Sequence, residues 1–236
     1  YGASVGILML ETRFPRIPGD MGNALSWPFP VQYRVVRGAT PDNVVRNDPT
    51  KLVDDFIDAG RDLVRSGCDG ITTNCGFLSL IQDQVKEALG VPVATSSLMQ
   101  VPMVQAMLPP GQRVGVITIS KTTLTAAHLK AAGAPLDTPI VGTDGGRCFT
   151  RDILRDAAEI DFDEARLDLR DAAHSMRKKH PDVGAIVLEC TNMVPYAQEI
   201  RAITGLPTYS IYSFIQWFQA GLAPRGFEPG LHDPRY

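Results

Sequence analysis

The sequence predicts an α/β protein made of two similar halves, each with a parallel sheet covered by helices. Short apolar runs rich in Val, Ile and Thr alternate with stretches of helical periodicity, which is typical of parallel sheets. Cys75 and Cys190 each follow such a run, and a Gly-x-Pro motif begins fifteen residues after each, at 90–92 and 205–207. One offset of 115 residues therefore relates the cysteines, glycines and prolines, and this indicates a duplicated unit.

The first half, residues 1–110, alternates strands and helices after a long loop. The expected elements are strand 4–10, loop 11–32, strand 31–36, helix 50–66, strand 69–73, helix 77–89, strand 91–95 and helix 97–107. Helix 50–66 has apolar residues at helical spacing, and Gly67 is a typical stop signal directly after it. The loop is rich in Pro and Gly, and so long a loop in a compact domain is typically functional or disordered.

The second half, residues 111–236, begins after Pro109-Pro110-Gly111 and repeats the order of the first. The expected elements are strand 113–118, helix 121–131, strand 138–142, helical stretch 150–179, strand 183–188, helix 193–203, strand 207–210 and helix 212–221. Asp161 and Glu164 resemble a capping box, so the long helical stretch should restart at Asp161. The Pro- and Gly-rich tail after Gly221 is expected to return to the surface.

Composition narrows the classes of function. The chain has 236 residues, 44% of them hydrophobic and 21% charged, which is ordinary for a globular protein. A net charge of −3 gives no reason to expect nucleic acid or an anionic membrane as a partner. Four cysteines without a C-x-x-C pair favour free thiols in a reducing cytoplasm, although a removed targeting segment before Tyr1 stays open. We also expect a homo-oligomer, such as a dimer.

The two matched cysteines predict acid/base chemistry. In parallel sheets, ligands bind beyond the carboxyl ends of strands, where both cysteines fall. Each stands at a strand-to-helix turn, where the helix N-terminus should lower the pKa of the thiol. Two thiols on opposite walls of a cleft would let one remove a proton from a carbon and the other return it, without a cofactor. A lone strand-end cysteine is more often a packing residue, but a matched pair favours function.

Paired cysteines in two similar halves resemble the aspartate/glutamate/hydantoin racemase superfamily. Cys190-Thr191-Asn192 is similar to the second signature of that superfamily, a cysteine followed by Thr and a polar residue. The resemblance covers nearly the whole chain in layout, with two short motifs. It implies a pseudo-symmetric α/β fold and cofactor-independent chemistry. It also implies that Cys75 and Cys190 are the acid/base residues and that Thr191 and Asn192 lie at the substrate carboxylate.

The first motif departs from the glutamate and aspartate racemases, in which Asn-Thr typically follows the cysteine. This chain has Asn74 before the cysteine and Gly76-Phe77 after it. The superfamily also includes hydantoin racemases, maleate isomerases, arylmalonate decarboxylases and algal dimethylsulfoniopropionate lyases, and this motif looks more similar to the last group. We take Asn74, Gly76 and Phe77 as substrate-binding candidates, with Gly76 letting the backbone approach the ligand. The substrate itself stays open.

Further candidates have structural alternatives. Thr118 and Ser120 follow strand 113–118 and either contact the ligand or cap the next helix. Asp20 and Asn23, with Thr12 and Arg13, fit a lid formed by the first loop, although Asp20 also suits a turn. Glu189 directly precedes Cys190, so on a strand its side chain should point away from the thiol, and we interpret it as structural. The four histidines lack metal-ligand spacing and are assigned no catalytic role.

Three functions remain open at this point. The leading hypothesis is a cofactor-independent racemase or epimerase that acts at a carbon next to the carboxylate of an amino acid or related small acid. The first alternative is a lyase of the same superfamily, which expels a leaving group after the same proton abstraction or decarboxylates a small carboxylate. The second is a non-catalytic protein that binds a small molecule. Inert, buried thiols would favour the last.

Overall fold

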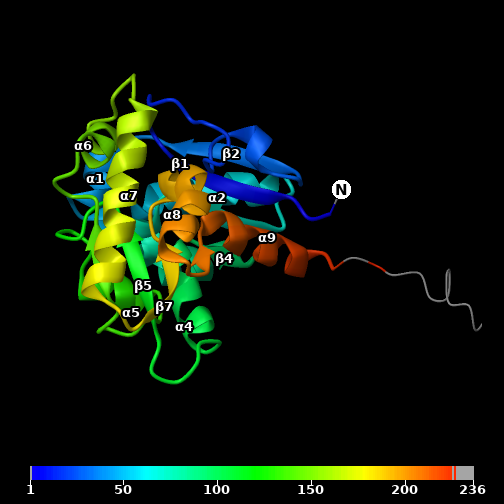
Figure 1. Ribbon diagram of the computed structural model, residues 1–236. Coiled ribbons are helices and arrows are strands. Elements are labelled where there is room, and N and C mark those ends of the chain that lie inside the picture. Colours follow the sequence, from blue (N-terminus) through cyan, green and yellow to red (C-terminus); the bar gives the residue numbers. More distant parts are fainter. Residues whose placement is uncertain (1, 225, 227–236) are drawn as a thin grey trace, which may run out of the picture.

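The computed structural model describes residues 2–224 and 226, and in this part of the chain it contains two four-stranded parallel sheets (Figure 1). The first sheet has the strand order β2-β1-β3-β4 and the second β6-β5-β7-β8, so the halves share one topology. The strands are β1 Val5–Leu10, β2 Val31–Val36, β3 Gly70–Thr73, β4 Val93–Ala94, β5 Arg113–Thr118, β6 Ile140–Gly142, β7 Val183–Leu188 and β8 Thr208–Tyr209. The predicted fold class is confirmed.

The helices follow the predicted order with different bounds. They are α1 Pro41–Val45, α2 Val53–Arg65, α3 Gln82–Leu89, α4 Gln100–Gln105, α5 Ala126–Ala131, α6 Phe149–Leu154, α7 Phe162–Lys179, α8 Ala197–Thr204 and α9 Ile211–Leu222. Four of them directly follow a 3₁₀ turn, and these turns are η2 Pro49–Leu52, η3 Gly76–Ile81, η4 Ser97–Met99 and η5 Thr191–Tyr196. A further 3₁₀ turn, η1 Ala24–Ser26, lies in the loop before β2. Helix α1 was not predicted, because it is one short turn within a segment without periodicity. The restart at Asp161 is confirmed, since its side chain accepts from the backbone N–H groups of Asp163 and Glu164.

The duplication predicted from the cysteines extends to the local structure. Each cysteine follows the third strand of its sheet order, then come a six-residue 3₁₀ turn and an eight-residue α-helix. Both helices end at a glycine in the left-handed region, with φ of 66° at Gly90 and 67° at Gly205. A residue with a side chain is strained at such a φ. The repeated helix end therefore requires glycine at the same place in each half.

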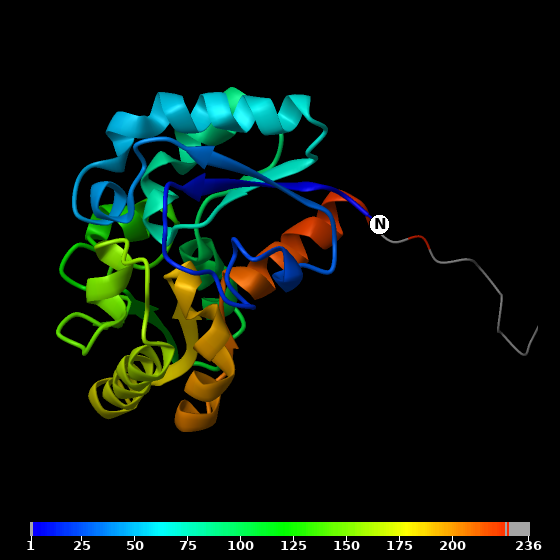
Figure 2. The same cartoon turned by 90° about the horizontal axis from the view of Figure 1, so that it is seen from above.

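Each half contributes its last helix to the sheet of the other half. Helix α2 covers one face of the first sheet, and α9, from the end of the chain, covers the other face (Figure 2). Phe214 and Phe218 of α9 belong to one apolar cluster with Val5 and Ile7 of β1. In the same way, α4 packs on β5 and β7. This exchange fixes the two sheets relative to each other. The boundary proposed near residue 110 lies in the turn between α4 and β5.

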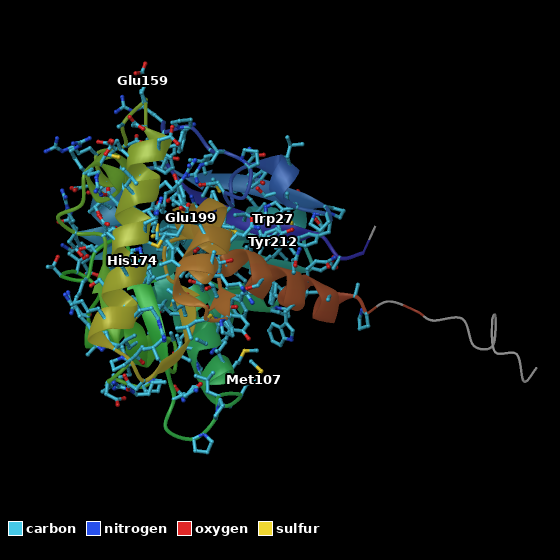
Figure 3. The ribbon with its side chains drawn as sticks, viewed as in Figure 1. Trp27, Met107, Glu159, His174, Glu199 and Tyr212 are labelled. Carbon is cyan, nitrogen blue, oxygen red and sulfur yellow. The ribbon has the colours of Figure 1, made fainter. Side chains whose placement is uncertain are left out.

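The loop after β1 is anchored rather than loose. The indole of Trp27 donates to the backbone oxygen of Met21, and its ring lies 5.4 Å from the ring of Tyr212 on α9 (Figure 3). Met21 is fully buried. The loop therefore packs on the exchanged helix. The predicted course of the C-terminal tail lies largely outside the described residues, and within them every helix is too short or too polar to cross a bilayer.

Candidate active site

Cys75 and Cys190 line the same pocket, which lies between the two halves. The pocket encloses about 350 Å³, including its open mouth. Five other residues singled out from the sequence line it: Thr12, Asn74, Gly76, Phe77 and Asn192. The remaining lining is mainly apolar and comes from several elements: Leu10, Phe14, Pro41, Val45, Ile119, Ile153, Leu154 and Glu189. The central geometric expectation, that two sulfur atoms distant in the sequence flank one cavity, agrees with this arrangement.

Cys75 occupies the turn between β3 and η3. Thr73 accepts a hydrogen bond from the backbone N–H of Cys75 and donates to the backbone oxygen of Thr95 at 2.6 Å, so the turn is fixed to β4. Beside it, Oδ1 of Asn74 accepts from the backbone N–H of Leu10 at 2.7 Å, while Nδ2 of Asn74 makes no hydrogen bond with the described residues. An amide N–H₂ is therefore available at the pocket wall next to the first thiol.

Cys190 occupies the equivalent turn between β7 and η5. Its thiol donates to Oδ1 of Asn192 at 3.6 Å, and Nδ2 of Asn192 donates to Oδ2 of Asp20 at 2.6 Å. These two contacts assign the orientation of the Asn192 amide. The side chain of Asn192 therefore joins the second thiol to the loop that follows β1 in the first half.

The pKa values of both thiols run opposite to the sequence expectation. The backbone N–H groups of Phe77 and Leu78 lower the pKa of Cys75, as predicted for a helix N-terminus. The backbone N–H of Asn192 lowers the pKa of Cys190 in the same way. Burial outweighs them, and the neighbouring Glu189 carboxyl adds to it, so the pKa of each thiol lies well above its usual range. A six-residue 3₁₀ turn has few aligned dipoles to offset the burial of the thiols. The thiols of the free protein are therefore protonated at neutral pH.

Glu189, interpreted from the sequence as structural, lines the pocket together with both thiols. Its Oε2 accepts a hydrogen bond from the hydroxyl of Thr118 at 2.7 Å. Its Oε1 is buried and has no hydrogen-bond partner among the described residues. Burial raises the pKa of Glu189 to about 7. The strand ends at Leu188, so alternation does not fix the direction of this side chain, and its carboxyl lies against Gly76 of the first half.

Residues of the loop after β1 bind one another and Thr12 of the pocket wall through hydrogen bonds and an ion pair. Asp20 is buried and pairs with Arg16 at 2.7 Å, and Arg16 donates to Thr12 of the pocket wall at 2.7 Å. Asn23 caps η1 and donates to the backbone oxygen of Arg16, so it supports the loop without lining the pocket. Arg13 lies at the exposed rim, where it pairs with Asp156 of the second half.

Three predicted residues lie behind the pocket rather than in its lining. Thr191 donates to the backbone oxygen of Asn74 at 2.6 Å and thereby joins the two cysteine turns. Thr118 holds Glu189, and Ser120 accepts or donates at 3.1 Å to Thr122. Each is buried. Their contacts indicate that they position the turns around the pocket.

Sequence reasoning missed the apolar wall and two charged groups. Helices α1 and α6 contribute Pro41, Val45, Ile153 and Leu154 to the pocket, but nothing in those short segments distinguishes them from core residues. Arg16 and Glu189 had a usable signal, since each is a charged residue next to predicted site residues. Within the described ranges, no three His, Cys, Asp or Glu side chains gather in a way that could hold a metal ion.

Comparison with known proteins finds relatives and structural neighbours. No family model matches the chain. Dimethylsulfoniopropionate lyase from Durusdinium sp. clade D is 28% identical over 227 residues, which span 93% of this chain and 75% of that protein. Dimethylsulfoniopropionate lyase 7 from Emiliania huxleyi (strain CCMP1516) is 28% identical over 230 residues, spanning 93% of this chain and 67% of its own. These relatives are longer than the chain described.

The structural neighbours share the fold at low sequence identity. A mutant of arylmalonate decarboxylase superposes with a TM-score of 0.64 and 18% identity, covering 96% of this chain and 97% of the other. Glutamate racemase from Francisella tularensis subsp. tularensis SCHU S4 superposes with a TM-score of 0.57 and 14% identity, covering 97% and 86%. The chain therefore shares its overall fold with arylmalonate decarboxylase and glutamate racemase.

Proposed function

We propose that the chain is a cofactor-independent lyase that removes a proton next to the carboxylate of a small acid and expels a leaving group from the adjacent carbon. The observation that carries this proposal is that Cys75 and Cys190 line one pocket together with Asn74 and Asn192. The relatives named dimethylsulfoniopropionate lyase favour elimination over racemisation, and they indicate a sulfonium acid as the substrate class.

The lining of the pocket suits such a substrate. Nδ2 of Asn74 is free to donate to a carboxylate, and the hydroxyl of Thr12 lies in the same wall with the guanidinium of Arg16 behind it. Apolar side chains such as Phe14 and Ile153 would pack against methyl groups on the sulfur. A sulfonium cation would also be attracted by the faces of aromatic side chains such as Phe14 and Phe77.

The reaction needs four bond changes and no external reactant. A cysteine thiolate takes the proton from the carbon next to the carboxylate, and the electron pair left on that carbon forms the double bond with its neighbour. The carbon–sulfur bond of the substrate breaks, and its electrons leave with dimethyl sulfide. Acrylate remains, and the proton stays on the cysteine until solvent removes it. Donors such as Asn74 stabilise the charge that develops on the carboxylate during proton removal.

Racemisation is the second candidate, because the pocket holds a second thiol. If the two thiols flank the bound substrate, one cysteine removes a proton from the carbon and the other donates a proton to its opposite face. The structural neighbours include glutamate racemase. A substrate without a leaving group would then be inverted rather than cleaved.

The products distinguish the two candidates. The protein would be incubated with dimethylsulfoniopropionate, and separately with aspartate and glutamate in D₂O, with release of dimethyl sulfide and acrylate and deuterium incorporation followed by NMR. We expect sulfide release that is lost in Cys75→Ala and Cys190→Ala. Cys68→Ala is the matched control, because Cys68 is equally buried but does not line the pocket. Deuterated, inverted amino acid without sulfide release would establish racemisation instead, and full activity in Cys75→Ala would contradict both candidates.

A further inference from the structure

Glu189 has a feature that its packing does not explain. The side chain is fully buried, and the backbone N–H of Ile119 favours the anionic form of its carboxyl. Oε2 has a hydrogen-bond partner, the hydroxyl of Thr118. Oε1 has none among the described residues. A buried polar atom without a hydrogen bond costs roughly 1–3 kcal/mol, and such atoms in native proteins often mark functional groups.

Oε1 lies close to the turns that carry both thiols. It lies against Gly76, the residue directly after Cys75, and a Cβ at position 76 would overlap it. The chain also places Glu189 directly before Cys190. Among the residues that line the pocket, Glu189 is the one side chain other than the two thiols that can carry a charge. Three acidic groups therefore share one small and largely apolar space.

The charged groups around this space cannot neutralise more than one negative charge in it. Arg16 and Asp20 come from the loop after β1 and pair with each other at 2.7 Å. Arg16 favours the anionic form of Cys75, whereas Asp20 opposes that of Cys190. His128 lies beyond Phe77, with ring centroids 4.9 Å apart, and burial lowers its pKa to about 4, so it is neutral. Two like charges in a desolvated pocket repel strongly.

We propose that Glu189, Cys75 and Cys190 share a single negative charge, so that Glu189 has to hold a proton before either thiol can lose one. This rests on the assignment of the two thiols as the acid/base pair in the proposed function. The proton count balances, because one sulfur–hydrogen bond breaks for each oxygen–hydrogen bond that forms on Glu189. Glu189 is thus a positioning residue that acts through the thiols. Its pKa of about 7 places the exchange near neutral pH.

The test is the pH dependence of thiol alkylation. Iodoacetamide labelling of the Cys75 and Cys190 peptides would be followed by mass spectrometry between pH 5.5 and 9.5, since the thiolate is the reacting form. In the wild-type protein we expect the rate to rise about tenfold per pH unit up to about pH 7 and then flatten, because further deprotonation falls on Glu189. In Glu189→Gln the rise should continue, so that the variant exceeds wild type about tenfold or more at pH 8.5.

Two features keep the result interpretable. Glu199→Gln on α8 removes the same charge from an exposed ion pair outside the pocket (Figure 3), and it should follow the wild-type profile. A wild-type rate that keeps rising tenfold per pH unit through pH 8.5 would overturn the proposal even if Glu189→Gln fails to fold. Slower labelling of Glu189→Gln would overturn it too. A flattened wild-type profile in a protein that cleaves no sulfonium substrate supports the shared charge and contradicts the proposed lyase, so the two claims fail separately.

Discussion

Asn192 donates a 2.6 Å hydrogen bond to Asp20, which ties the turn that carries Cys190 to the loop after β1. Asp20 also accepts from Arg16, which in turn donates to Thr12 at the pocket wall. A continuous set of polar contacts therefore runs from the second thiol through the loop and back to the pocket. Buried groups hold the loop against the turn that carries Cys190, in addition to the exposed pair of Arg13 with Asp156.

Asp20→Ala tests this arrangement. The substitution leaves a nearly buried guanidinium and the Asn192 amide without their acceptor, and breaking a buried ion pair in this way typically costs about 3 kcal/mol or more. We expect the free energy of unfolding in urea to fall by about that amount. Asp58→Ala removes a carboxylate from an exposed pair with Arg61 and should change stability by less than about 1 kcal/mol. An equal decrease in the free energy of unfolding in both variants would show that the buried contacts of Asp20 stabilise the protein no more than an exposed ion pair does.

The sequence predicted the parts of the site that depend on local pattern. Apolar runs placed the strands, and the carboxyl-end rule placed each cysteine, with the side chains next to it, at the carboxyl edge of its own sheet. The equal offsets of Gly90 and Gly205 predicted a duplicated unit, and both glycines end a helix in the same left-handed conformation. These features require only short-range periodicity and the geometry of parallel sheets, so they are readable from one chain.

The parts that failed depend on which groups meet across the two halves. The expectation that Glu189 is a structural residue pointing away from Cys190 did not reveal that its carboxyl lines the pocket and lies against Gly76 of the other half. The expected low pKa of the thiols neglected their burial, which is set by loops and helices far away in the sequence. The exchange of α4 and α9 between the sheets has no local signal either, because each helix is amphipathic whichever sheet it covers.

Gly76→Ala tests the contact between the halves. A Cβ at this position would lie 2.5 Å from the backbone oxygen of Glu189 and closer still to its Oε1, so the two cysteine turns must separate. Overpacking of this kind typically costs about 1–3 kcal/mol, and activity should fall with it. Gly221→Ala on α9 is the matched control, because its Cβ meets no atom within 4 Å and alanine favours helix. Thermal unfolding would compare the two, and an unchanged melting temperature in Gly76→Ala would refute the tight contact.

The raised pKa of Glu189 predicts a stability that falls as pH rises. In the unfolded chain the pKa of the carboxyl is near its ordinary value of 4.5, whereas burial raises it to about 7 in the folded protein. Between these values the folded state binds a proton that the unfolded state has released, so the stabilisation present at low pH is lost toward pH 7. Relative to Glu189→Gln, wild type should lose about 2 to 3 kcal/mol between pH 5 and 8. Urea unfolding of both proteins at each pH measures the difference, and parallel curves would contradict it.

Asn74→Asp distinguishes the role of the side-chain oxygen of Asn74 from that of its nitrogen. The new carboxyl keeps the oxygen that accepts from the backbone N–H of Leu10, so the turn should stay in place. It replaces the free Nδ2 donor by an oxygen that repels a substrate carboxylate when ionised. A hydrogen bond to a charged group contributes about 1.5–3 kcal/mol, so KM should rise about tenfold to a hundredfold, with a smaller change in kcat.

The same variant should recover at low pH, because a protonated carboxyl again donates a hydrogen bond from that position. The ratio of its KM to that of wild type, measured at each pH with dimethylsulfoniopropionate, should therefore decrease as pH falls below the pKa of the new group. Asn47→Asp makes the same change at an exposed position outside the pocket lining and should leave KM unaltered at every pH. A KM ratio near one at neutral pH, or one that does not vary with pH, would remove Asn74 from the carboxylate site and leave the pocket without its assigned anion donor.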